Sequence, residues 1–129
     1  MKWKDSLSVG NVLIDNQHQE LIRRYNDLLD ACNQGKGKQE ISKTLNFLGE
    51  YVKVHFNSEE EQMQKHNYPE YTDHKKQHDE FILQYNALKD EFEQGKQIIV
   101  IIRANKMLSD WLLNHIGITD RKLGGFLKG

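Results

Sequence analysis

The stretch HKKQHDEFILQYNALKDEF, residues 74–92, decides the fold, because its large apolar residues recur at the three- and four-residue spacing of one helical face. That face carries two histidines followed by apolar and aromatic residues: His74, His78, Phe81, Tyr85, Leu88 and Phe92. We predict a helix over about Thr72–Gln94, with Gly95 as its C-terminal cap, since glycine readily adopts the left-handed conformation that ends helices. The pattern therefore predicts a helix that packs against others and places two imidazoles in the core.

Three more stretches on either side show the same periodicity, at about residues 15–33, residues 39–64, and from residue 97 to about residue 120. Their predicted inner faces are Ile14, His18, Leu21, Ile22, Tyr25, Leu28, Leu29 and Cys32; then Ile41, Leu45, Leu48, Val52, His55, Phe56, Glu59 and Met63; then Ile101, Ala104, Leu108, Trp111 and His115. The breaks at residues 35–37 and 66–69 are short, which favours antiparallel neighbours. We predict an all-α protein, an up-down-up-down four-helix bundle.

The two ends of the chain lie outside this periodicity. The first dozen residues are predicted to form an irregular N-terminal arm, anchored to the bundle by Trp3. The apolar pattern fades after Asp120, and Gly124 and Gly125 predict a short glycine-rich tail. A length of 129 residues suits one core, so we expect a single domain over residues 1–129.

Composition excludes several classes of partner. Eighteen basic and nineteen acidic residues give a net charge of -1, without the basic stripe that nucleic-acid binding requires. The most apolar run, Ile98–Ile102, is far shorter than the roughly 20 residues that span a bilayer. The single cysteine, Cys32, has no partner for an internal disulfide, and no apolar signal segment follows Met1. We expect a cytoplasmic protein that binds neither nucleic acid nor membrane.

Six polar residues occupy positions that the periodicity assigns to the core: His18, His55, Glu59, His74, His78 and His115. A lone core histidine is usually hydrogen-bonded rather than metal-bound, but here all four helices contribute. His55 and Glu59 are four residues apart, as are His74 and His78, so each pair can point at one centre. Imidazoles and carboxylates together suit iron, zinc or copper. With Asp120 added, seven donors exceed the needs of one tetrahedral zinc and indicate two metal ions.

Asp120 is the weakest geometric element of this set. Five residues separate it from His115, which in an ideal helix leaves the two side chains roughly 140° apart. Gly117 lies between them. We predict a widened turn or a bulge near Ile116–Ile118 that directs Asp120 inward.

Other metal chemistries require different spacings. The ferritin-like di-iron pattern needs Glu three residues before a ligand histidine, and no histidine here has one. A zinc protease of the HExxH type needs Glu directly after the first histidine, where this chain has Lys75. Covalent haem attachment through paired cysteines is excluded by the lone Cys32.

Four segments together resemble the hemerythrins, and most of all the bacterial single-domain members (bacteriohemerythrins). They are IDNQH at 14–18, HFNSE at 55–59, HKKQH at 74–78 and WLLNHIGITD at 111–120. The arm LSVG at 7–10 and the turn at Tyr68 and Pro69 also match, so the resemblance covers nearly the whole chain.

The resemblance implies a non-haem di-iron centre that binds dioxygen reversibly, for storage, delivery or scavenging. It implies that His74, His78 and His115 bind one iron ion and that His18 and His55 bind the other, while Glu59 and Asp120 bridge the two together with an oxo or hydroxo group. The iron with two histidines keeps a position open for dioxygen. Leu112, Leu113 and Ile116 are candidates for the apolar wall of that pocket, or for ordinary core.

Three alternative functions stay open at this point. The same pocket could serve a dioxygen or redox sensor, an enzyme that reduces peroxide, nitric oxide or dioxygen, or a protein of iron storage or regulation. A carrier rather than an enzyme is the first interpretation, and we expect a monomer.

Several other residues are predicted to be structural. His66 falls in a turn and is expected at the surface. Glu60 and Glu61 are expected to face outward as solvated charges, since Glu59 faces inward. Cys32 is expected to be a buried small hydrophobe, and the tryptophans and tyrosines to be packing groups.

Overall fold

The computed structural model describes residues 3–95 and 97–128, and within these it leaves out the side chains of residues 97–101, 108, 112 and 113. The predicted inward positions of Ile101 and Leu108, and the wall positions of Leu112 and Leu113, lie outside the described side chains. The elements are a short 3₁₀-helix (Asp5–Leu7), α1 (Val12–Asn33), α2 (Lys38–Lys65), α3 (Tyr71–Glu93), α4 (Gln97–Trp111), a π-helical segment (Leu112–Asp120) and α5 (Arg121–Lys128).

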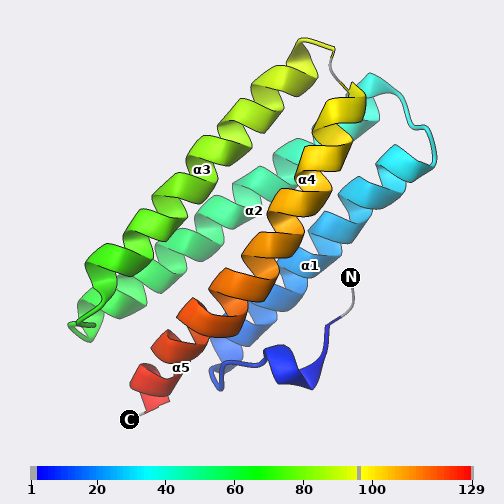
Figure 1. Ribbon diagram of the computed structural model, residues 1–129. Helices are drawn as coiled ribbons and strands as arrows, with labels where there is room; N and C mark the ends of the chain where they lie inside the picture. The colour runs from blue at the N-terminus through cyan, green and yellow to red at the C-terminus, as the bar shows by residue number, and fades with distance from the viewer. Residues whose placement is uncertain (1–2, 96, 129) are drawn as a thin grey trace.

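The four long helices form the predicted antiparallel bundle. Figure 1 shows α1 to α4 side by side, each running opposite to the one before it, and α4 packs back against α1. Helix α1 begins three residues earlier than predicted because Asn11 caps it: the Asn11 side chain accepts a hydrogen bond from the Ile14 backbone N–H at 3.0 Å. The connections are as short as predicted, and Gly35 and Gly95 follow α1 and α3 with φ of 66° and 87°.

The predicted inner faces are largely the buried ones. All eight predicted positions of α2 and all six of α3 are buried. In α1 the stripe from Ile14 to Leu28 is buried, whereas Leu29 and Cys32 are only partly buried and pack against the core from its edge. In the part of the chain that follows α3, Ala104 and His115 are buried and Trp111 is half-buried.

The predicted glycine-rich tail is wrong. Gly124 and Gly125 lie inside α5, and Leu123 is fully buried. A Cβ added to Gly124 would lie 2.0 Å from the carbonyl oxygen of Val9, so glycine at this position allows α5 to pack directly on the N-terminal arm. At residue 124 glycine serves close packing rather than flexibility.

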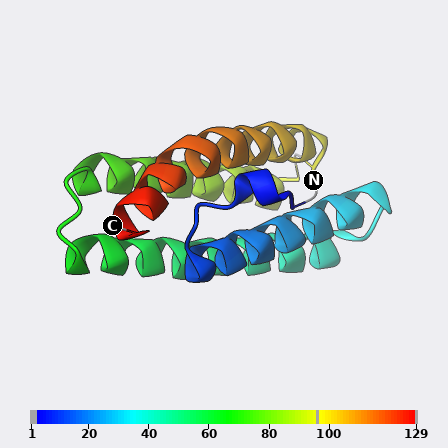
Figure 2. The ribbon, with the colours of Figure 1, turned by 90° about the horizontal axis from the view of Figure 1, so that it is seen from below.

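The N-terminal arm is held against the bundle, as predicted. In Figure 2 it runs back along the bundle from the start of α1. Trp3 and Leu7 are partly buried against the main core, and the Arg121 guanidinium donates a hydrogen bond to the Ser6 carbonyl. Val9 of the arm and Leu123 of α5 pack together in one apolar cluster, whereas Trp3 and Leu7 pack against the main core along the bundle.

Two apolar clusters enclose a polar layer. The larger cluster fills most of the bundle, and the smaller one, Val9, Ile14, Met63, Tyr68 and Leu123, closes the end where α1 begins. Along α1, His18 lies between Ile14 of the smaller cluster and Leu21 of the larger. The polar core residues are thus shielded from water on both sides along the bundle axis. None of the helices described combines the length and apolar character needed to cross a membrane.

Candidate metal centre

All seven candidate residues meet in the polar layer, and none is more than 2% exposed. They form two groups in which one donor atom per residue lies within 4.8 Å of every other. One group is Glu59, His74, His78, His115 and Asp120, and the other is His18, His55, Glu59 and Asp120. The two groups share both carboxylates, an arrangement that suits two neighbouring cations.

The π-helical segment Leu112–Asp120 explains how Asp120 reaches the layer. Hydrogen bonds in a π-helix join residues five apart, so residues at that spacing lie on one face. The His115 Nε2 and Asp120 Oδ1 atoms are 3.0 Å apart, and Asp120 is fully buried. The predicted widening is present, although it extends over nine residues rather than one turn.

Each of the five histidines turns its Nε2 atom toward the shared carboxylates. The Nε2 distances are 2.9 Å from His18 to Asp120, 3.3 Å from His55 to Glu59, 3.1 Å from His74 to Glu59, 3.0 Å from His78 to Glu59 and 3.0 Å from His115 to Asp120. The Nε2 atoms of His78 and His115 lie 3.2 Å apart. Adjacent nitrogens on one ion with bonds of about 2.1 Å lie at about this separation.

Three of the histidines have a hydrogen-bond acceptor at Nδ1. Gln17 Oε1 lies 2.7 Å from His55, Gln77 Oε1 lies 2.8 Å from His115, and Glu60 Oε2 lies 3.0 Å from His78. Since these oxygens only accept, each Nδ1 donates, and the Nε2 of the neutral ring carries a lone pair.

These lone pairs point at carboxylate oxygens, which are also rich in electrons. Glu59 Oε2 and Asp120 Oδ1 are fully buried, and they face the Nε2 atoms of His55 at 3.3 Å and of His115 at 3.0 Å. Buried anions and lone pairs that face one another need cations between them. The donor set therefore fits metal ions that prefer imidazole and carboxylate, as iron does.

In the metal-free protein, protons on the histidines supply part of the positive charge that bound cations would bring. Burial lowers the pKa of His18 and of His74, but hydrogen bonds to Asp120 and Glu59 outweigh burial and raise each pKa to about 9. Burial likewise raises the pKa of Glu59 and of Asp120, and the surrounding histidines reverse the effect and hold both carboxyls well below their usual range. The layer therefore favours positive charge.

Aromatic rings fix two of the imidazoles. The Phe56 ring stacks on His78 with centroids 3.9 Å apart and an interplanar angle of 4°, and Trp111 stacks on His115 at 3.9 Å and 13°. With the ring face held by stacking and the ring edge by a hydrogen bond, each Nε2 is kept on the carboxylates before any ion binds.

Glu60 is not the outward-facing, solvated residue that the sequence predicted. Its side chain is 17% exposed and accepts a hydrogen bond from a candidate ligand, whereas Glu61 is exposed as predicted. His66 is also exposed as predicted. Cys32 is partly buried rather than buried, and burial raises its pKa, which fits a packing role.

Sequence reasoning also missed Gln17 and Gln77. Each glutamine directly precedes a candidate ligand on its own helix and reaches a ligand on the next one, Gln17 to His55 and Gln77 to His115. Glutamine before histidine in both motifs was the available signal. Of the proposed wall residues, Ile116 is buried in the larger cluster.

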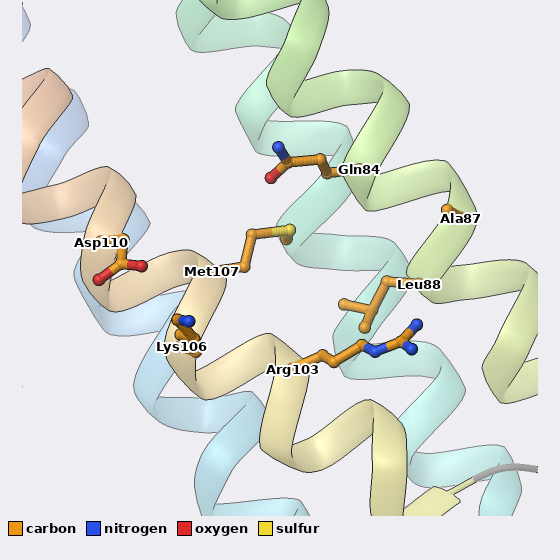
Figure 3. A pocket seen from close by; sticks show the side chains of 7 residues that line it. All are labelled: Gln84, Ala87, Leu88, Arg103, Lys106, Met107 and Asp110. Atoms are coloured by element: carbon orange, nitrogen blue, oxygen red, sulfur yellow. The ribbon is translucent and has the colours of Figure 1, made fainter.

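Surface hollows border the three-histidine group. One of about 320 Å³ reaches His115, one of about 220 Å³ reaches His74 and another of about 220 Å³ reaches His78. Figure 3 shows a neighbouring hollow of about 350 Å³, lined by Gln84 and Leu88 of α3 and Met107 of α4, which shares residues with the hollow at His115. Neither His18 nor His55 lines any of these four hollows.

Comparison with known proteins agrees with this geometry. The family model described as the hemerythrin HHE cation binding domain matches residues 9–127. Bacteriohemerythrin of Methylococcus capsulatus is 36% identical, covering 96% of this chain and 94% of the relative. Myohemerythrin of Theromyzon tessulatum is 32% identical, covering 98% of this chain and 92% of the relative.

A solved structure leads to the same family. The crystal structure of wild-type hemerythrin superimposes with a TM-score of 0.87 at 31% identity, covering 100% of this chain and 98% of that chain. The family, the helical bundle and the buried histidine and carboxylate cluster fit a di-iron oxygen-binding protein. The chain belongs to the hemerythrin family.

Proposed function

We propose that this chain binds dioxygen reversibly at a pair of iron ions, and that it acts in dioxygen storage, delivery or scavenging rather than as an enzyme. The observation that carries the proposal is the shared pair of buried carboxylates, Glu59 and Asp120, faced by five Nε2 atoms from two groups of unequal size.

The ligand division follows those two groups. His74, His78 and His115 would hold one iron ion, His18 and His55 would hold the other, and Glu59 and Asp120 would serve both; an oxo or hydroxo group would belong to the same cofactor. A pair of ferrous ions held there would supply the two electrons that reversible dioxygen binding requires. Because the second group, with His18 and His55, offers one imidazole fewer, it would leave room for dioxygen at the ion that it holds.

The chain's own contribution is orientation and shielding. Five neutral imidazoles make the site less electron-rich than one made of carboxylates, which favours binding of dioxygen over its cleavage. The apolar clusters on both sides of the layer limit entry of water and protons, and Ile116 belongs to the larger one.

The proposal also covers the domain organisation, the cellular location and the oligomeric state of the protein. We propose one domain over residues 1–129, which the family match over residues 9–127 supports. We propose a cytoplasmic location, which the free cysteine Cys32 fits, and a monomer.

Anaerobic reconstitution with ferrous iron tests the function. Metal counting should give two iron ions per chain, and admitting air should produce a visible absorption band that disappears under vacuum over repeated cycles. A band that never reverses, or a single metal ion per chain, would contradict the carrier function. Either result would favour a redox enzyme, a sensor or a site for another metal. Catalytic turnover of peroxide or nitric oxide with an added electron donor would favour the enzyme.

A further inference from the structure

Glu60 distinguishes one ligand imidazole from the others. Among the three histidines that have an acceptor at Nδ1, His55 and His115 face the neutral amide oxygens of Gln17 and Gln77, at 2.7 and 2.8 Å. Of these three, and within the part of the chain that the structure describes, only His78 faces a carboxylate, that of Glu60 at 3.0 Å. A hydrogen bond to a charged acceptor is roughly twice as strong as one to a neutral acceptor.

The surroundings preserve this contact. The His78 ring lies flat against Phe56, which leaves its Nδ1 edge directed at Glu60. Glu60 is only 17% exposed, so solvent screens its charge incompletely. The Lys75 ammonium approaches the other oxygen of Glu60 at 3.6 Å and also contacts Asp79 at 3.0 Å, so it offsets the carboxylate charge only in part.

We propose that Glu60 is a positioning residue that makes His78 the most electron-donating imidazole of the centre and thereby stabilises the ferric form of the three-histidine iron. A carboxylate acceptor pulls the Nδ1 proton outward and raises the electron density at Nε2, which strengthens the bond to the more highly charged ion. The inference rests on the ligand division proposed above.

Glu60→Gln tests the inference, because glutamine keeps the size and the acceptor oxygen and removes the charge. The iron-loaded variant is titrated anaerobically with dithionite and redox mediators, and the ferric absorption is followed. We expect the equilibrium constant for reduction to rise about tenfold, and ferric iron to be bound about 10–100-fold more weakly in competition with a chelator. An unchanged reduction equilibrium at full iron content would overturn the proposal.

Two more variants separate the hydrogen bond from general charge effects. Glu61→Gln removes the same charge from the next residue of α2, which is exposed, and should leave the reduction equilibrium unchanged. Gln77→Glu places a carboxylate on His115 and should shift the equilibrium toward the ferric form. Equal shifts from Glu60→Gln and Glu61→Gln would show that the contact with His78 plays no part.

The titration also separates this inference from the proposed function. It requires bound iron but no dioxygen. A wild-type protein that fails to release dioxygen under vacuum would overturn the carrier while leaving the effect of Glu60 measurable. A wild-type protein that cycles normally, beside a Glu60→Gln variant with an unshifted equilibrium, would overturn only the role of Glu60.

Discussion

Asp120 contacts both groups of the candidate centre, with Oδ1 at 3.0 Å from His115 Nε2 and Oδ2 at 2.9 Å from His18 Nε2. The π-helical segment makes this contact possible, because a regular helix would turn the carboxylate away from His115. Asp120 therefore joins the two groups from the C-terminal side of the bundle, as Glu59 does from α2.

Asp120→Asn is expected to weaken binding of both iron ions, because an amide has only one oxygen to offer where the carboxylate has two. The loss of affinity should exceed the roughly 10–100-fold typical of removing an outer hydrogen-bond partner of a ligand. Iron counting after dialysis measures it. Asp110→Asn, at an exposed position of α4, is the matched control and should keep both ions. Retention of both ions by Asp120→Asn would remove this residue from the centre.

His55→Ala is expected to affect the two ions unequally. It takes one of two imidazoles from the group with His18 and none from the group with His74, His78 and His115. Iron counting should give about one ion per chain, and the variant should lose the band produced by air. His66→Ala, in the exposed turn, should change neither. Equal loss of both ions from His55→Ala would contradict the ligand division.

The sequence predicted the bundle and the meeting of six of the seven polar residues because both depend on periodicity along single helices, whereas Asp120 lies off that periodicity. Glu60 and Gln77 depend instead on how neighbouring helices pack. Glu60 lies one residue after Glu59, about 100° around α2, which turns it from the core to the boundary with α3. The packing of α2 against α3 decides whether a side chain at that position contacts solvent or His78. The periodicity of a single helix does not reveal how it packs against its neighbour. The widened turn was predictable because His115 and Asp120 had to share a face.

Loss of metal is expected to make the stability of the protein strongly dependent on pH. The pKa values of His18 and His74 lie at about 9 in the folded metal-free protein, above the usual value of 6.5. Their protonated forms therefore stabilise the fold fully below about pH 6.5, and this contribution falls as the pH rises through about 9. Glu59 and Asp120 have lowered pKa values, so the same interactions are also lost in acid, as the carboxyls take up protons.

Urea unfolding of the metal-free protein measures this effect. The midpoint should be lower at about pH 10 than at about pH 6, and the iron-loaded protein should show a smaller difference because the ions replace those protons. A midpoint of the metal-free protein that rises between these two pH values would contradict the charge arrangement of the polar layer.

Gly124 and Gly125 are neighbours in α5 for which we expect opposite effects on stability. Alanine at Gly124 would bring a Cβ to 2.0 Å from the Val9 carbonyl oxygen, a backbone atom that moves only if the arm moves, so we expect a loss of about 1–3 kcal/mol. A Cβ added at Gly125 would meet none of the described atoms within 4 Å outside its own turn of helix, and alanine there should stabilise the helix by about 0.5–1 kcal/mol. Chemical denaturation of both variants measures the difference. Stabilisation by both substitutions would mean that α5 does not pack on the arm, and that the end of the bundle beside Asp120 is closed in some other way.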